Sequence, residues 1–236
     1  MAGQTYRIRL FGGFALERSD GEVVSLPQRR ADAILAILAV SGDMGASRER
    51  LLGLLWPESD ASRARRSLRD ALYAIRTTAG ADALLSPADT LRLDPGVVSS
   101  DVGAFAAALG AARLAEAVDL YRGPLLDGFH LDGSAAFERW LDDERERLFR
   151  DYQLALKRLA KKAEHEDRWD AAADWWGRAV AADRFNTRLV VRRMVALARA
   201  GDRANAVQEA EAHQRLTTWA LQYHDQNGKI FDVSAV

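Results

Sequence analysis

Apolar residues recur every three or four positions between residues 60 and 76, in the segment DASRARRSLRDALYAIR. At about 3.6 residues per turn, this spacing predicts an amphipathic helix with one stripe packed on a core. The stripe comprises Ala61, Ala64, Leu68, Leu72 and Ile75. The opposite face is polar and comprises Ser62, Arg63, Arg66, Arg69, Asp70 and Tyr73. Five arginines against two aspartates make the segment positively charged, so it is expected to meet an anionic partner.

The chain before this helix first alternates polar and apolar positions and then becomes continuously apolar. Residues 6–26 predict three short antiparallel strands separated by glycine-containing turns. Residues 30–40 have the apolar density of a buried helix. Ser47 is expected to cap a second helix, which ends at Pro57.

The 60–76 helix itself is expected to be capped by Ser59 or Asp60. Residues 84–93 then predict a hairpin, because two short apolar runs flank a Ser-Pro-Ala-Asp turn. Helix, turn, helix and hairpin in this order are typical of a winged helix-turn-helix, whose second helix enters the major groove while the wing reaches the backbone. The leading strands narrow this prediction to the type found in OmpR-like response-regulator effector domains.

Beyond the Asp-Pro-Gly sequence at residues 94–96, the pattern predicts helices only. The first three are predicted over residues 101–109, 113–122 and about 134–164. We therefore predict an OmpR-type winged helix domain over residues 1–97. An all-α, tetratricopeptide-like domain is predicted over residues 98–236, so that the protein is α+β at its N-terminus and mainly α overall.

An internal repeat supports the tetratricopeptide-like prediction. Residues 166–172 (EDRWDAA) match residues 201–207 (GDRANAV) at a spacing of 35 residues, close to the tetratricopeptide period of about 34. Residues 112–118 (ARLAEAV) are a weaker echo. Each segment opens a helix with small residues, so stacked helix pairs are expected. Trp175 and Trp176 cannot both face a core, which leaves one of them for a contact surface.

Composition bounds the class of protein. The chain is 48% hydrophobic, has a formal net charge of -1 and contains no cysteine, which excludes disulfides and thiolate chemistry. Its longest apolar run, residues 33–40, is far too short to cross a bilayer. The N-terminus also lacks the pattern of a signal peptide. We therefore expect a cytoplasmic protein with no membrane contact.

Motifs for catalysis are absent from the sequence. It contains no GxxxxGK, GxGxxG, HExxH or GxSxG segment. The four histidines are scattered, and His165 among acidic neighbours is interpreted as a polar helix end rather than a metal ligand. We therefore predict that the protein is not an enzyme and has no catalytic residue, no metal and no cofactor.

The winged-helix prediction assigns DNA contacts to particular residues. A guanidinium group can bind guanine bidentately, so the outer face of the helix is expected to read bases. The predicted base-reading residues are Ser62, Arg63, Arg66, Asp70 and Tyr73. The predicted phosphate contacts lie at the flanks of that face, on the preceding helix and on the wing, and are Arg48, Arg65, Arg69, Arg76, Thr90 and Arg92. Arg29 and Arg30 are left open between a phosphate contact and simple exposure.

Two stretches in each half of the chain carry a family resemblance. They are residues 55–58 (LWPE), 64–72 (ARRSLRDAL), 117–129 (AVDLYRGPLLDGF) and 137–145 (FERWLDDER). These stretches resemble the Streptomyces antibiotic regulatory protein family and its relatives, which join an OmpR-type winged helix to a bacterial transcriptional activator domain. The resemblance implies a cytoplasmic activator that binds direct repeats near promoters and contacts RNA polymerase.

The chain departs from this family in three places, one of which is the tyrosine common in the last helix, replaced near residues 210–212. Residues 183–186 (DRFN) replace the usual Asp-Pro-x-x-Glu step between repeat helices. After the last repeat the helical pattern fades, and residues 226–229 (QNGK) predict a turn into a short apolar end. These departures affect the expected geometry of the last repeat and leave the DNA-binding half unchanged.

Together, these features predict a sequence-specific DNA-binding transcriptional activator that reads promoter DNA through the 60–76 helix and the 84–93 wing. The α-helical domain is expected to serve dimerisation on DNA or contact with RNA polymerase or another partner. The residues leave one alternative open. The chain would then be a protein-interaction scaffold, or the sensory front module of a larger signalling protein, without specific DNA readout.

Overall fold

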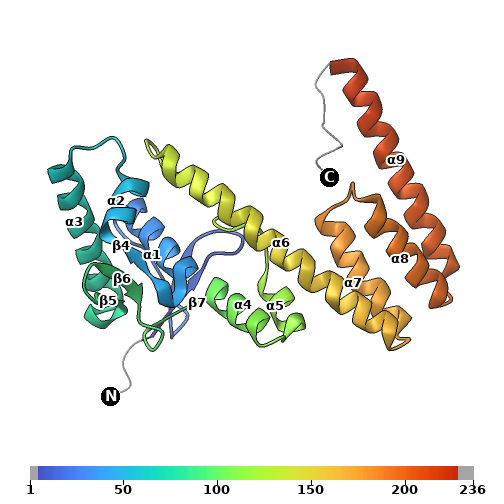
Figure 1. Cartoon of the computed structure of the whole chain (residues 1–236), viewed down its shortest axis with the longest axis horizontal. Helices are drawn as coiled ribbons and strands as arrows, with labels where there is room; N and C mark the ends of the chain where they lie inside the picture. The colour runs from blue at the N-terminus through green and yellow to red at the C-terminus, as the bar shows by residue number, and fades with distance from the viewer. Residues whose placement is uncertain (1–4, 228–236) are drawn as a thin grey trace. The chain divides into compact units, whose positions relative to one another are not determined.

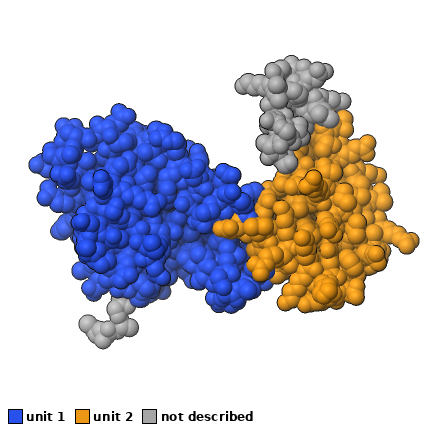
Figure 2. All heavy atoms as spheres, viewed as in Figure 1, with its two compact units in different colours: residues 1–150 blue, residues 151–236 orange. Residues whose placement is uncertain are grey.

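The computed structural model describes residues 5–227, with side chains described up to residue 218. An α+β N-terminal part is followed by helices only, which confirms the predicted fold class (Figure 1). The chain divides into two compact units, residues 1–150 and residues 151–236 (Figure 2). The division falls within one long helix. The predicted turn at residues 226–229 extends outside the described residues. The predicted domain boundary after residue 97 stays a prediction.

Four short strands form the first sheet. β1 (Tyr6–Arg9), β2 (Ala15–Arg18) and β3 (Val23–Val24) are the three antiparallel strands that the sequence predicts. β7 (Val98–Ser100) pairs in parallel with β1, which gives the order β3-β2-β1-β7. Alternate residues of β1 face the core, and Ile8 is fully buried. The sequence did not predict β7, because a strand this short shows no alternation of its own.

Three helices follow the first strands. They are α1 (Arg29–Ser41), α2 (Arg48–Leu55) and α3 (Ala61–Ala79). α1 is buried along almost its whole length, as its apolar density predicts. α3 runs beyond the predicted range of 60–76 and ends where Gly80 adopts a φ of 93°, a conformation that favours glycine.

A second sheet follows α3 in the chain. The predicted 84–93 hairpin consists of β5 (Leu84–Leu85) and β6 (Thr90–Leu93), which pair antiparallel. The other edge of β6 pairs with β4 (Ala46–Ser47), so the order is β4-β6-β5. Short 3-10 turns precede β4 and β5, at η1 (Gly42–Met44) and η2 (Ala81–Ala83). Because β4 leads directly into α2, the hairpin is fixed against the start of that helix.

The rest of the described chain is helical. The helices are α4 (Asp101–Gly110), α5 (Leu114–Leu120), α6 (Ala135–His165), α7 (Trp169–Ala182), α8 (Thr187–Arg199) and α9 (Arg203–Asn227). α5 ends two residues before the predicted Arg122, because the backbone becomes extended at Tyr121. Within residues 5–227, none of the helices is long and apolar enough to cross a membrane.

The turns before α7 and α9 lie 34 residues apart, from Asp167 to Gly201, which is one less than the spacing of the sequence match, whereas the similar turn before α5 lies 55 residues before Asp167. The turns before α5, α7 and α9 each place one residue at positive φ, namely Ala112, Asp167 and Gly201. The next amide in each turn donates to a carbonyl five residues back, which closes the preceding helix. The fourth residue of each following helix is a buried alanine, at Ala117, Ala172 and Ala206. The sequence match instead paired Asp167 with Asp202 and was wrong by one residue.

The two neighbouring tryptophans of α7 have different environments. Trp176 is 2% exposed, and its indole Nε1 donates to Oε1 of Glu164 at 2.7 Å. Trp175 is half-buried, and the guanidinium carbon of Arg178 lies 5.2 Å from its ring centroid. One tryptophan therefore belongs to the core and the other reaches the surface, as the helical phase predicts.

Gly45 makes the pairing of β4 with β6 sterically possible. Its φ is 62°, and a Cβ atom there would lie 2.3 Å from the carbonyl oxygen of Leu91 in β6. Gly45→Ala should lower the free energy of unfolding by about 2 kcal/mol, because both the backbone conformation and the contact oppose a side chain. Urea unfolding followed by circular dichroism measures this change.

Gly53 provides the matched control for this substitution. It is exposed within α2, and no atom lies within 4 Å of the position of a Cβ. Gly53→Ala should raise the free energy of unfolding by up to about 1 kcal/mol, because alanine is the better helix former. Equal effects of the two substitutions would contradict the close approach at Gly45.

Candidate nucleic-acid interface

Asp60 fixes the start of α3. Its Oδ1 atom accepts hydrogen bonds from the backbone amides of Ser62 at 3.1 Å and Arg63 at 2.9 Å. The Ser62 hydroxyl donates to the same oxygen at 2.7 Å. These bonds, first the one from the Arg63 amide, lower the pKa of the Asp60 carboxyl. The hydroxyl of Ser62, a predicted base-reading residue, therefore already donates its proton to Asp60, so it can only accept a hydrogen bond from a ligand.

The buried stripe of α3 determines which residues face outward. Its buried residues are Ala64, Leu68, Ala71, Leu72, Ile75 and Ala79. The five predicted base-reading residues, Ser62, Arg63, Arg66, Asp70 and Tyr73, are all exposed. Ala61 is also exposed, so its predicted place in the stripe was wrong. The reason is that the whole first turn of α3, from Ala61 to Arg63, projects away from the core.

The outward arginines of α3 are largely free of acidic partners. Arg63 has an ion pair with Asp60 at 3.6 Å across the first turn. Within residues 5–218, no carboxylate forms an ion pair with Arg65, Arg66 or Arg69, and all three are exposed. Since Asp70 does not neutralise its neighbour Arg66, this face presents unpaired guanidinium groups to solvent.

The turn of the hairpin is held from both sides by arginines that were predicted to contact phosphate. Arg48, at the start of α2, donates from Nη1 to the carbonyl oxygen of Ala88 at 3.1 Å and lies 4.0 Å from a carboxylate oxygen of Asp89. Arg76, near the end of α3, donates from Nη2 to the Ser86 hydroxyl at 3.2 Å. These contacts bring the hairpin next to α3.

The two remaining predicted phosphate contacts lie on β6. Thr90 pairs with Ser47, which caps α2 by accepting from the amide of Arg50 at 3.1 Å. Arg92 lies opposite Leu85 in the hairpin and is half-buried. Its Nε atom is buried without a hydrogen-bond partner. Both side chains are therefore less accessible than the exposed arginines of α3, a difference that the sequence pattern did not indicate.

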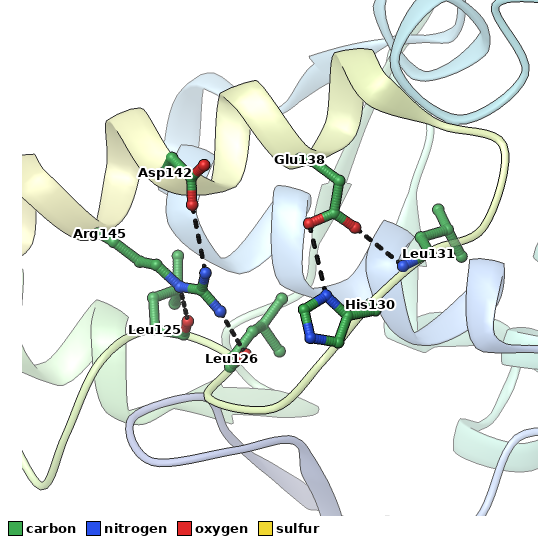
Figure 3. Close-up of polar contacts among 7 residues, drawn as sticks. All are labelled: Leu125, Leu126, His130, Leu131, Glu138, Asp142 and Arg145. Atoms are coloured by element: carbon green, nitrogen blue, oxygen red, sulfur yellow. Dashed lines mark hydrogen bonds and ion pairs between the residues drawn. The ribbon is translucent and has the colours of Figure 1, made fainter. Parts of the chain in front are cut away.

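Sequence reasoning missed the side chains of α6 that fix the loop between α5 and α6. Arg145 donates from Nε to the carbonyl oxygen of Leu125 and from Nη2 to that of Leu126, both at 2.8 Å (Figure 3). Glu138 accepts from the amide of Leu131 at 2.9 Å, and its other oxygen lies 3.9 Å from Nδ1 of His130. The loop is therefore tied to α6 near both of its ends.

The same loop reaches the end of α2, just before α3. The Ser134 hydroxyl donates to the carbonyl oxygen of Leu54 at 2.5 Å. Arg30 donates from Nε to the carbonyl of Leu55 at 3.1 Å and from Nη2 to that of Asp132 at 3.2 Å. Carbonyls in the last turn of a helix lack intrahelical donors, so these side chains satisfy them. Arg30 thus has a structural role, because it joins α1 to the end of α2 and to this loop.

A second junction joins β1 to α4. The carboxylate of Asp101 accepts from the backbone amides of Leu10 and Phe11, each at 3.0 Å. Burial raises the pKa of Asp101, while those amide bonds oppose the rise. The backbone continues the contact, because the amide of Leu126 donates to the carbonyl of Leu10 at 2.7 Å. In the sequence, the family motifs at residues 117–129 and 137–145 marked these junctions as important. A single sequence does not show which residues those motifs contact.

Comparison with solved structures identifies the class of fold. The chain matches Mycobacterium tuberculosis EmbR, in a structure described as a complex with a low affinity phosphopeptide, at a TM-score of 0.66 and 19% identity. The match covers 96% of this chain and 62% of that chain, so this chain spans less than two thirds of the EmbR chain. The two share their fold. A comparison with curated proteins gave no match.

Comparison with protein families gives a more specific assignment. Residues 95–221, more than half of the chain, match the family described as the bacterial transcriptional activator domain. The matched segment contains the motifs at residues 117–129 and 137–145. The chain therefore belongs to the bacterial transcriptional activator domain family. This result confirms the resemblance to regulators of the Streptomyces antibiotic regulatory protein type.

The cap at Asp60 should be measurable as a pH-dependent contribution to stability. Asp60→Ala should lower the thermal midpoint at neutral pH, because two amides lose their acceptor, whereas Asp60→Asn should retain most of the capping. The lowered pKa means that the contribution is present above the ordinary carboxyl pKa of about 4 and is lost as the pH falls through the folded value. Thermal unfolding of wild type and both variants at neutral and acidic pH tests this. An asparagine variant as unstable as the alanine variant would contradict the capping role.

Arg145 should be required for the stability of the loop between α5 and α6. Arg145→Ala removes two hydrogen bonds. It leaves the carbonyl of Leu125 without a donor, while that of Leu126 keeps the Phe129 backbone amide, and it should lower the free energy of unfolding by about 2 kcal/mol. Arg145→Lys should recover only part of this loss, because lysine cannot reproduce the fork of the guanidinium group. Urea unfolding measures both variants. Arg139→Ala, at an exposed position of the same helix, is the control and should change stability by less than about 0.5 kcal/mol.

Proposed function

We propose that this member of a transcriptional activator family is a sequence-specific DNA-binding protein that acts at promoters in the cytoplasm. The observation that carries the proposal is the outer face of α3, where Arg65, Arg66 and Arg69 are exposed and unpaired in the described part of the chain. The chain as a whole has a net charge of only -1, so this concentration of positive charge is local. An anionic polymer such as the DNA backbone matches it.

The position of the hairpin favours duplex DNA over other anions. Arg48 and Arg76 hold the hairpin turn beside α2 and α3, so the helix and the hairpin present one surface. A helix that enters the major groove together with a wing that follows the neighbouring backbone is the arrangement of a winged helix. We assign α3 to the major groove and residues 84–93 to the wing on this basis.

We divide the contacts into base-reading residues and phosphate contacts. Arg63, Arg66, Asp70 and Tyr73 read base edges, with Ser62 as an acceptor only. Arg65 and Arg69 bind phosphates at the flanks of the groove, and contact with several phosphates releases counterions, so binding weakens as salt increases. Arg48, Arg76, Thr90 and Arg92 contribute first by positioning the wing and then by binding backbone phosphates.

The activator domain has a different role in this proposal. It contacts RNA polymerase or another protein, or a second copy of the chain on adjacent half-sites. Recognition of the DNA site is the role of α3 and the wing. The mechanism is binding rather than catalysis. Family membership supports an activator, and stacked helix pairs provide surfaces that recognise partners by shape and charge.

The division of arginines can be tested on DNA selected with the protein itself. A duplex recovered from a random library with the full chain serves as the specific probe, and a scrambled duplex serves as the reference. Arg66→Ala should reduce the preference for the selected duplex, because a bidentate contact to guanine is worth about 1 to 3 kcal/mol of discrimination. Arg65→Ala should weaken both duplexes equally and reduce the dependence on salt. Fluorescence anisotropy titrations measure these affinities.

Arg139→Ala on α6 is the control for nonspecific loss of charge and should leave both affinities unchanged. Equal behaviour of the Arg65 and Arg66 variants would contradict the division into base-reading and phosphate-binding residues. Equal affinity of the wild-type chain for every duplex would contradict specific readout. That result would favour a protein-interaction scaffold instead.

A further inference from the structure

The outer face of α8 combines positive charge with exposed apolar side chains. α8 contains four arginines and no acidic residue. Its exposed face has a stripe of residues at helical spacing, Arg188, Val191, Arg192, Val195 and Arg199, which we call the α8 stripe. Val191 is 49% exposed and Val195 is 45% exposed. α8 packs against α7 and α9 (Figure 1). The exposed stripe is therefore the side that remains for another molecule.

The arginines of this stripe are mostly free to bind an external anion. Within residues 5–218, Arg188 has no carboxylate partner, and Arg199 lies over the Trp169 ring at 5.5 Å rather than beside an acid. Arg192 lies 3.6 Å from a carboxylate oxygen of Glu164 and is itself exposed. Both ends of the stripe therefore carry an uncompensated positive charge, with the two valines between them.

The charge continues onto the neighbouring surface of α6. Glu164, the partner of Arg192, belongs to α6, and Lys161 lies one turn before it on the same helix. Arg158 and Lys161 are exposed and have no ion pair within the described side chains, and Leu154 is 54% exposed one turn earlier. α6 therefore repeats the combination found on α8, an exposed apolar residue beside unpaired cations.

We propose that the α8 stripe, together with Arg158 and Lys161 of α6, binds an acidic, leucine-containing segment of a partner protein. The cations provide complementarity to acidic side chains and select against basic partners. Val191 and Val195 accept the apolar side chains of an amphipathic segment laid along α8. The stripe from Arg188 to Arg199 is about 16 Å long, which is enough for about three turns of a bound helix.

The valines distinguish this surface from a nucleic-acid site. A surface for DNA phosphates needs cations and hydrogen-bond donors, and exposed valine side chains add nothing to phosphate binding. The outer face of α3 illustrates the difference, because its arginines are not interleaved with exposed aliphatic residues larger than alanine. The chemistry of the α8 stripe thus fits a peptide that is both acidic and apolar.

This inference rests on the proposed function, in which the activator domain contacts a partner, and it gives that partner a chemistry. The test uses the full chain and a fluorescein-labelled synthetic peptide in which glutamates and leucines occupy opposite faces of a helix of about four turns. Fluorescence anisotropy should show saturable binding that weakens, without disappearing, as salt increases. A peptide with the leucines replaced by serine should bind about tenfold more weakly, because the apolar contact is lost.

Substitutions on the α8 stripe should reproduce these losses. The double variant Val191→Ser, Val195→Ser should weaken peptide binding about tenfold, and Arg188→Glu should do the same by reversing a charge. The matched controls lie at exposed positions of α9: Val207→Ser for the valines and Arg203→Glu for the arginine. Both controls should bind the peptide as the wild type does. Circular dichroism confirms that every variant is folded.

Several outcomes would overturn the proposal. Equal binding of the serine-substituted peptide would show that charge alone acts, and equal losses in the α9 controls would show that the stripe has no special role. Competition by duplex DNA would identify a nucleic-acid surface. A change of oligomeric state in the valine variant, measured by sedimentation, would identify a contact between copies of this chain. The stripe variants should bind duplex DNA as the wild type does. If the wild type itself does not bind duplex DNA, that result contradicts the proposed function rather than this inference.

Discussion

The carbonyl groups at the end of α2 are the constraint on which the arrangement of residues 1–150 depends. A helix that ends inside a folded unit leaves carbonyls without intrahelical donors. The turn from α2 to α3 is therefore stable only if other groups donate hydrogen bonds to these carbonyls. Here the donors are Ser134, from the loop before α6, and Arg30, from α1. The proposed DNA-reading helix is therefore positioned by a segment that belongs to the activator domain family, not only by its own stripe.

This dependence explains why the two family motifs at residues 117–129 and 137–145 belong together. The first motif forms a loop whose carbonyls point to α6, and Leu126 and Gly128 adopt positive φ within it. The second motif lies on α6 and supplies Arg145, which binds two of those carbonyls. A loop of this shape without the arginine would leave the carbonyl of Leu125 unpaired, and the arginine without the loop would keep only Asp142 as an acceptor. The two motifs therefore stabilise each other through these hydrogen bonds.

The sequence predicted those parts of the molecule in which neighbours along the chain determine the structure. The three leading strands, the cap at Asp60, the hairpin and the outward face of α3 follow from periodicity and turn chemistry. The parts that it missed depend on distant partners. Ala61 is exposed because the first turn of α3 lies beyond the core, β7 exists only through β1, and the amides of Leu10 and Phe11 are satisfied by Asp101. The replaced step at residues 183–186 is also stabilised locally, because the side-chain Nδ2 of Asn186 donates to the Asp183 carboxylate at 2.9 Å.

The surroundings of the arginines show why charge alone does not define a function. α3 and α8 have similar numbers of arginines, yet their settings differ. On α3, Asp60 caps the helix, the buried stripe is continuous and the outer arginines are surrounded by polar side chains. On α8, two exposed valines separate the arginines. Valine side chains add no favourable interaction with a phosphate, whereas their burial against leucine stabilises a complex with a protein. The apolar residues between the charges, rather than the charges, therefore distinguish the two surfaces.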